Sequence, residues 1–148
     1  MKTITQQWKD ARDISAIAHE GAKDLAGQPY YCHVSRVAHN FGQNNYGIVA
    51  YLHDVVEDTN WTLNQLREKG FSSEIVEAID AITRRKGEVY MDYINRCARN
   101  TIAIHVKLAD LTDNMDISRL PELTDKDIAR LRKYQKAYHF LKSKLNRP

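Results

Sequence analysis

The segment AYLHDVVEDT, residues 50–59, says most about both the fold and the chemistry of this chain. It places the pair His53-Asp54 and, after two valines, the pair Glu57-Asp58 in a stretch that is otherwise mostly apolar. Residues four apart stack on a helix, so we expect His53 above Glu57 and Asp54 above Asp58, in one polar stripe. Three neighbouring carboxylates repel one another unless a cation lies between them, whereas a solvated helix end would also tolerate such a charge run. This segment alone leaves both interpretations open.

Two further segments contribute side chains of the same kind. PYYCHVSRVA, residues 29–38, carries His33 directly after a loop that contains a proline. VKLADLTDNM, residues 106–115, carries Asp110 within a helix that is otherwise largely apolar. Imidazole and carboxylate together are a common ligand set for divalent metals, so the three segments together favour a metal site.

The rest of the chain is predicted to be helical, because apolar residues recur at steps of three and four. Residues 102–106 alternate as in a strand, but the apolar positions continue at helical spacing to Met115, which favours a helix. Gly21 to Pro29 lacks such periodicity and is predicted to be a loop. The expected helices span 5–20, 34–41, 46–57, 62–70, 75–82, 90–97, 102–115 and 124–141. We therefore expect an all-α, single-domain bundle of about seven or eight helices over residues 1–148.

Composition excludes several classes of protein. Hydrophobic residues make up 43% and charged residues 28% of the 148 residues, which is typical of a globular domain. The net charge of +3 is not concentrated in one run, so we expect no general nucleic-acid binding. Cys32 and Cys97 have no CxxC spacing and are expected to be reduced thiols of a cytoplasmic protein. No membrane span or signal peptide is expected, and the oligomeric state stays open.

Four elements, in this order and spacing, carry a family resemblance: AHEGAKDLAGQPYYCH (18–33), LHDVVEDT (52–59), Ile82-Thr83 and VKLADLTDNM (106–115). From about Ala16 to Met115 the chain resembles the HD superfamily, and more closely the hydrolase domain of the RelA/SpoT-type enzymes that degrade the alarmone (p)ppGpp. The resemblance implies an HD-type helical fold and a divalent metal, most often manganese. The ligands that it implies are His33, His53, Asp54 and Asp110.

The same resemblance assigns the reaction. It implies that Glu57 and Asp58 orient or deprotonate the attacking water, whose nucleophilicity a metal ion increases. Attack on phosphorus would then release pyrophosphate from the ribose 3′ position of (p)ppGpp. Lys107 lies near the Asp110 face of the same predicted helix and is expected to form a salt bridge with a carboxylate.

Candidate contacts to a small-molecule nucleotide substrate follow from position. Asn114 lies one helical turn beyond Asp110 and matches an asparagine of the family that contacts the nucleotide. Lys23 lies in the loop where the family carries basic residues around the guanine base. Tyr31, or its neighbour Tyr30, is expected to stack on the base. Arg85, in the basic run 84–86, is expected near the pyrophosphate, although a solvated loop would explain this run as well.

The chain departs from the family at positions that bear on the substrate. Asp24 and Leu25 stand where arginine and lysine are common, and Asp116 replaces a frequent basic residue. The leading hypothesis is a stand-alone (p)ppGpp 3′-pyrophosphohydrolase. One alternative is a phosphatase acting on another nucleotide, such as a deoxynucleotide or a phosphorylated dinucleotide cofactor. A non-catalytic metal- or nucleotide-binding regulator is a third possibility, against which the intact pair Glu57-Asp58 argues.

Overall fold

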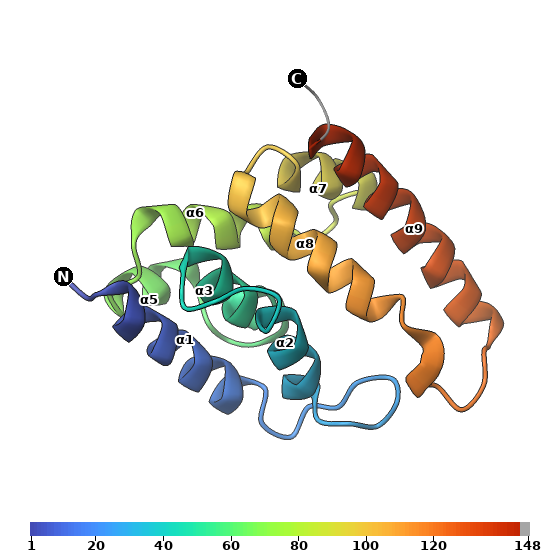
Figure 1. The fold of residues 1–148 in the computed structure, drawn as a ribbon, viewed down its shortest axis with the longest axis horizontal. Helices are drawn as coiled ribbons and strands as arrows, with labels where there is room; N and C mark the ends of the chain where they lie inside the picture. Colours follow the sequence, from blue (N-terminus) through green and yellow to red (C-terminus); the bar gives the residue numbers. More distant parts are fainter. Residues whose placement is uncertain (146–148) are drawn as a thin grey trace.

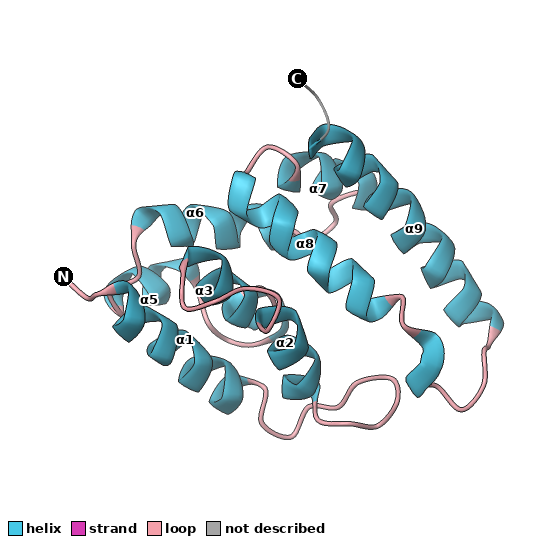
Figure 2. Ribbon diagram, in the orientation of Figure 1, coloured by secondary structure: helices cyan, strands magenta, loops and turns pink. Residues whose placement is uncertain are grey.

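The computed structural model describes residues 1–145, and all regular secondary structure within them is helical (Figures 1 and 2). One helix, α4, is a single turn, so the described chain holds eight α-helices of six or more residues, as the sequence predicts. The segment whose alternation mimics a strand is helical. The elements are α1 (Ile4–Ala18), α2 (Tyr30–Ala38), α3 (Asn45–Leu52), α4 (Val55–Asp58), α5 (Leu63–Glu68), α6 (Ser73–Ile82), α7 (Tyr90–Cys97), α8 (Thr101–Asn114), the 3-10 turn η1 (Ile117–Arg119) and α9 (Asp125–Leu145).

Helix α8 organises the molecule because its two faces serve two separate hydrophobic clusters. Ile102, Ala103 and Val106 belong to the larger cluster, to which each of the helices α1 to α7 also contributes. Leu108 and Leu111 belong to a second cluster, which α7 and α9 complete. Figure 1 shows α9 lying along the side of α8 that is turned away from α1 and α3. Asp110, which is 4% exposed, therefore lies on a helix that is packed on two sides.

The ends of several helices follow from local side-chain chemistry. Thr62 and Gln65 form the expected capping box of α5, each side chain bonding the backbone N–H of the other residue. Asn100 caps α8 by accepting hydrogen bonds from two backbone N–H groups. These caps fix where α5 and α8 begin, and α8 carries Asp110.

The expected continuous helix from Tyr46 to Glu57 is wrong at one point. Helix α3 ends at Leu52, and the chain turns at His53 and Asp54 before the single turn of α4. Asp54 has φ −110° and ψ −2°, away from regular helical values. The predicted polar stripe is consequently split: His53 is 2% exposed, whereas Glu57 and Asp58 are exposed.

The loop between α1 and α2 is ordered by its own hydrogen bonds. Gly21 and Gly27 have φ of 81° and 82°, a left-handed conformation that favours glycine. Lys23 and Pro29 form an isolated antiparallel bridge that closes the loop. In Figure 1 this loop projects beside the end of α2. Among the described helices, none combines the length and apolar character needed to cross a bilayer.

Candidate metal centre

Four residues from three separate parts of the chain bring their ligand atoms together. His33 comes from the first turn of α2, His53 and Asp54 from the turn after α3, and Asp110 from the middle of α8. One ligand atom from each residue lies within 4.8 Å of the other three. We call these residues the metal cluster. They form a group of imidazoles and carboxylates that could hold a metal ion.

Both imidazoles are oriented by the nitrogen that faces away from the cluster. Nδ1 of His53 donates to the carbonyl oxygen of Ala50 at 2.6 Å, and Nδ1 of His33 donates to Asp113 Oδ2 at 2.6 Å. Since both partners are acceptors, each Nδ1 carries the proton and each Nε2 points into the cluster. Nε2 of His33 is buried without a well-oriented hydrogen-bond partner in residues 1–145, although Asp110 Oδ1 lies 2.9 Å away. Such an atom fits a metal ligand.

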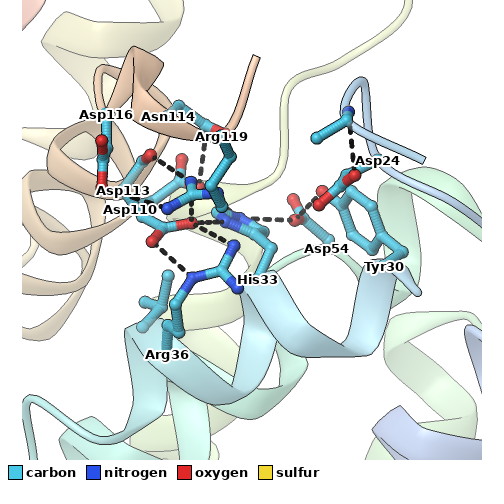
Figure 3. A network of polar contacts seen from close by, with 12 residues as sticks. Asp24, Tyr30, His33, Arg36, Asp54, Asp110, Asp113, Asn114, Asp116 and Arg119 are labelled. Atoms are coloured by element: carbon cyan, nitrogen blue, oxygen red, sulfur yellow. Dashed lines mark hydrogen bonds and ion pairs between the residues drawn. The ribbon is translucent and has the colours of Figure 1, made fainter. Parts of the chain in front are cut away.

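Figure 3 shows Asp110 beside His33 and Asn114. Lys107 Nζ donates to its Oδ2 at 2.8 Å, which confirms the expected salt bridge, and Asn114 Nδ2 donates to its Oδ1 at 3.0 Å. Burial alone would raise the pKa of Asp110, but the charges of Lys107 and His53 hold this pKa well below its usual range. The carboxylate is therefore ionised, as metal binding requires.

The carboxylates of the cluster raise the pKa of both histidines, although burial opposes this rise. Burial lowers the pKa of His33, but its contacts with Asp110 and Asp113 outweigh this effect and raise the pKa to about 9. Asp54 lies 3.0 Å from His53 Nε2 and accepts a hydrogen bond from the hydroxyl of Tyr30 at 2.5 Å. The charges of the protonated histidines therefore stabilise the carboxylates of Asp54 and Asp110, as a divalent cation would also do.

Glu57 and Asp58 lie beside the cluster on α4. Glu57 Oε1 accepts a hydrogen bond from the backbone N–H of Arg84 at 2.9 Å, which fixes its direction. Partial burial raises the pKa of Asp58 to about 7, and the negative charges of Asp54 and Glu57 add to this rise. Partial burial also raises the pKa of Glu57, and the Arg84 N–H opposes that rise. A carboxylate with a pKa near neutrality suits proton transfer.

A cavity of about 340 Å³ opens next to His33, between the loop after α1 and the end of α8. We call it the loop cavity. Lys23 and Asn114 line it, together with Asp24, Tyr30, Arg36, Asp113, Asp116 and Arg119 among others. Its size lies within the range of pockets that bind small molecules. The structure therefore places two of the four expected substrate contacts in one cavity beside the cluster.

The expected stacking residue Tyr31 does not line this cavity. Its ring stacks on Tyr51 with centroids 6.3 Å apart, whereas Tyr30 lines the cavity and contacts Asp54. Residues three apart share a helix face, so Tyr30 and His33 point the same way while Tyr31 is turned aside. Tyr30, the alternative in the sequence analysis, is the tyrosine at the site.

Arg85 also lies outside the loop cavity. It lines a second cavity of about 600 Å³, the basic cavity, together with Glu57, Arg84 and Lys86. Its guanidinium is mostly exposed and lies 3.7 Å from Asp80. Any contact of Arg85 with a ligand would therefore be made on the side of Glu57, separately from Lys23 and Asn114.

Asp24 lines the loop cavity, but one of its carboxylate oxygens is engaged within its own loop. Its Oδ1 accepts hydrogen bonds from the backbone N–H groups of Ala26 and Gln28, so the side chain organises its own loop. This arrangement is typical of an Asx turn.

Sequence reasoning missed three residues near the cluster. Asp113 contacts His33 and is itself bound by Arg36 and Arg119. The sequence offered little reason to select these three residues, because a charged residue near a helix end is usually solvated. His19, the C-cap of α1, is also near: its ring is buried 5.1 Å from that of Tyr30, and its Nε2 lacks a partner in residues 1–145.

Curated relatives resemble most of this chain. A Haemophilus influenzae protein named guanosine-3′,5′-bis(diphosphate) 3′-pyrophosphohydrolase is 33% identical over 117 residues, which cover 69% of this chain and 17% of that protein. The Escherichia coli K12 protein named bifunctional (p)ppGpp synthase/hydrolase SpoT is 28% identical over 130 residues, covering 78% and 18%. The chain thus spans less than a fifth of the length of these relatives, and the similarity concerns one region of them.

A solved structure has a similar fold over nearly the whole length of this chain. It is described by the words "A metazoan ortholog of SpoT hydrolyzes ppGpp and plays a role in starvation responses". The TM-score is 0.75, and the match covers 95% of this chain and 88% of that chain. The two sequences are 22% identical, and the match therefore concerns the fold. No protein-family model matches the chain.

Proposed function

Because this chain belongs to the family of RelA/SpoT-type hydrolase domains, we propose that it is a metal-dependent (p)ppGpp 3′-pyrophosphohydrolase. The observation that carries the proposal is the convergence of two Nε2 atoms and two carboxylates, from three separate segments, within 4.8 Å of one another. We further propose that residues 1–148 form one HD-type domain of this kind. The names of the relatives support the substrate class, and the geometry supports the metal.

We propose His33, His53, Asp54 and Asp110 as the ligands and manganese as the ion. Two nitrogen and two oxygen donors suit manganese, and they leave coordination positions for water and phosphate. A bound divalent cation would lower the pKa of water and neutralise negative charge on the phosphate. Two features of the chain support metal binding: hydrogen bonds at Nδ1 orient both imidazoles, and the lowered pKa of Asp110 keeps its carboxylate ionised.

Glu57 and Asp58 are proposed to orient the attacking water and accept its proton. Their exposure on α4 leaves them accessible to solvent water, and the Arg84 N–H directs Glu57. The water oxygen forms a bond to the 3′-linked phosphorus, and the bond from that phosphorus to the ribose oxygen breaks. Pyrophosphate leaves, and the ribose 3′ oxygen takes up a proton to become a hydroxyl group.

The nucleotide is proposed to occupy the loop cavity. Lys23 provides positive charge there, Asn114 offers an amide for a ribose hydroxyl, and Tyr30 replaces Tyr31 as the aromatic contact. Arg85 lines the basic cavity with Glu57 and is proposed to contact the departing pyrophosphate. Both free cysteines, Cys32 and Cys97, agree with a reducing compartment, and we propose a cytoplasmic location.

A second candidate keeps the same chemistry but changes the substrate to another nucleotide, such as a deoxynucleotide or a phosphorylated dinucleotide cofactor. Its support is the charge of the loop cavity. Positions 24 and 116 carry aspartates, and Lys23, Arg36 and Arg119 are the cations lining it, two of them already paired with Asp113. Fewer free cations in the cavity would favour a substrate with less charge there.

The test is a panel of nucleotides incubated with purified protein and manganese, with chromatography of the products and an assay for pyrophosphate. We expect pyrophosphate from (p)ppGpp, and loss of this release in His53→Ala together with loss of bound metal. Selective turnover of a different nucleotide would favour the second candidate. Metal and nucleotide binding without any turnover would identify a non-catalytic regulator and contradict the proposal.

A further inference from the structure

Asp113 joins three elements of the fold directly behind the metal cluster (Figure 3). It lies at the end of α8, three residues after Asp110. Its Oδ2 accepts the Nδ1–H of His33 at 2.6 Å, and its Oδ1 accepts the Nε–H of Arg36 at 2.8 Å. Arg119 of η1 donates to its backbone carbonyl at 2.9 Å and lies 3.4 Å from its Oδ2. One carboxylate therefore connects α2, α8 and η1.

The contact with His33 determines which ring nitrogen faces the cluster. A carboxylate can only accept, so Nδ1 of His33 donates to Asp113 and Nε2 is the nitrogen that faces Asp54 and Asp110, where a metal ion would take the place of its proton. Asp113 lies on the Nδ1 side of the ring and is not among the four residues whose ligand atoms converge. Asp113 therefore contacts a proposed metal ligand without being a ligand itself.

Asp113 is itself held firmly enough to orient a neighbour. Arg36 binds it through both Nε and Nη2, the second contact measuring 3.1 Å. Burial would raise the pKa of Asp113, but hydrogen bonds from His33 and Arg36 hold this pKa well below its usual range. A paired, ionised carboxylate with two fixed donors has little freedom to turn away from His33.

We propose that Asp113 is a positioning residue for His33, and that Arg36 and Arg119 hold Asp113 in that role. This inference rests on the proposed metal site and deepens it. Replacement of the carboxylate that orients a metal-binding histidine weakens metal affinity about 10- to 100-fold. A purely structural salt bridge at Asp113 would change stability and leave the affinity of the folded protein for metal unchanged.

The test is calorimetric titration of Mn²⁺ alone into metal-free wild-type protein and variants, whose fold is checked by circular dichroism. We expect Asp113→Ala to bind Mn²⁺ about 10- to 100-fold more weakly than wild type. Asp113→Asn should lie in between, because an amide oxygen still accepts from Nδ1. Asp116→Ala is the matched control: Asp116 also pairs with Arg119 at 3.1 Å, while Asp113 alone of the two contacts His33. Its affinity should stay within twofold of wild type.

A second measurement needs no substitution and covers a failure of Asp113→Ala to fold. In zinc-loaded wild-type protein, nitrogen-15 shifts of His33 should show a protonated Nδ1 and a coordinated Nε2. Coordination through Nδ1 overturns the inference, as does unchanged Mn²⁺ affinity in both folded Asp113 variants. Absence of metal binding in wild type would instead overturn the proposed function, and the inference with it.

Discussion

Glu57 and Asp58 are neighbours on α4, yet the structure holds them differently. Glu57 receives a backbone hydrogen bond from Arg84, whereas the pKa of Asp58 is raised to about 7 by partial burial and by neighbouring carboxylates. A glutamine at position 57 can still accept the Arg84 N–H but cannot take a proton. Replacing Glu57 therefore tests proton transfer while its hydrogen bond to Arg84 is kept, and replacing Asp58 tests the effect of its charge.

Glu57→Gln should keep metal affinity within a few-fold of wild type and lower kcat by about 10²-fold or more, as loss of a general base does. Steady-state release of pyrophosphate from (p)ppGpp, with metal content measured in parallel, checks this expectation. Glu77→Gln, a change at an exposed glutamate on α6, is the control and should retain full turnover. Full turnover in Glu57→Gln would remove its proposed role in activating water.

Asp58→Asn should stabilise the metal-free protein at pH 8 more than at pH 4.5. The pKa of Asp58 in the folded protein, about 7, lies above its ordinary value of 3.8, so folding favours the protonated form. The stability that depends on this proton is present at acid pH and is lost as the pH rises through 7. Urea unfolding of both proteins at the two pH values measures the difference. A stability difference that does not change with pH would contradict the raised pKa.

At the scale of single residues, the sequence located the cluster but not its surroundings. His33, His53, Asp54 and Asp110 were identified from their spacing and from the family motifs, and the fold brings all four together. Which of two adjacent tyrosines faces the site depends on where α2 begins, and the expected start at residue 34 was four residues late. Helix ends are the least regular part of a sequence pattern.

At the scale of elements, the turn at His53 and Asp54 is what makes the cluster possible. A continuous helix would have placed the pair on the same face as Glu57 and Asp58, as we expected from periodicity. The turn instead buries His53 and leaves the α4 carboxylates exposed. Periodicity could not reveal this break because Val55 and Val56 continue the apolar pattern through it.

Helix α3, which leads into that turn, is anchored by a close approach at Gly47. A Cβ added there would lie 2.1 Å from the carbonyl oxygen of Gly42 and 3.2 Å from Trp8 Nε1. Gly47→Ala should therefore destabilise the protein by about 1–3 kcal/mol, as overpacking does, although alanine has the higher helix propensity. Urea unfolding checks the value.

Gly42→Ala is the matched control for this prediction. A Cβ at Gly42 would meet only Asn44 Nδ2, at an ordinary 3.6 Å. Its effect on unfolding should be close to zero. Equal stability of the two variants would show that α3 does not press against the Gly42 backbone as described.

At the scale of the whole molecule, α8 joins two hydrophobic clusters while carrying Asp110 between them. The ligands of the proposed metal come from three parts of the fold: His33 lies on α2, His53 and Asp54 follow α3, and Asp110 lies on α8. A metal that ties these elements together binds the folded chain and not the unfolded one. Metal binding should therefore increase the free energy of unfolding of the whole protein.

Mn²⁺ at about 100 times its Kd should stabilise the protein by about 2.7 kcal/mol. For a domain of this size the melting temperature should then rise by about 5–10 °C. Differential scanning calorimetry with manganese and with a chelator measures the shift. Asp54→Asn, which weakens the ligand set, should lose most of it. An equal rise in wild type and Asp54→Asn would place the stabilising ion elsewhere.

The helical class and the order of the elements could be predicted because amphipathic periodicity and capping residues are local properties of the chain. The loop cavity could not, since it depends on how the loop after α1 meets the end of α8 and η1. Long-range contacts such as His33 with Asp113 leave no periodic signal in a single sequence. They are also the contacts on which the account of metal affinity depends.

Anomalous X-ray scattering at the manganese absorption edge, from crystals of the wild-type protein soaked in Mn²⁺, tests the central claim most directly. The account predicts a strong peak within bonding distance of His33 Nε2, His53 Nε2 and one oxygen each of Asp54 and Asp110. A strong peak elsewhere on the molecule, or none at these four side chains in a crystal that leaves the site open, would contradict it.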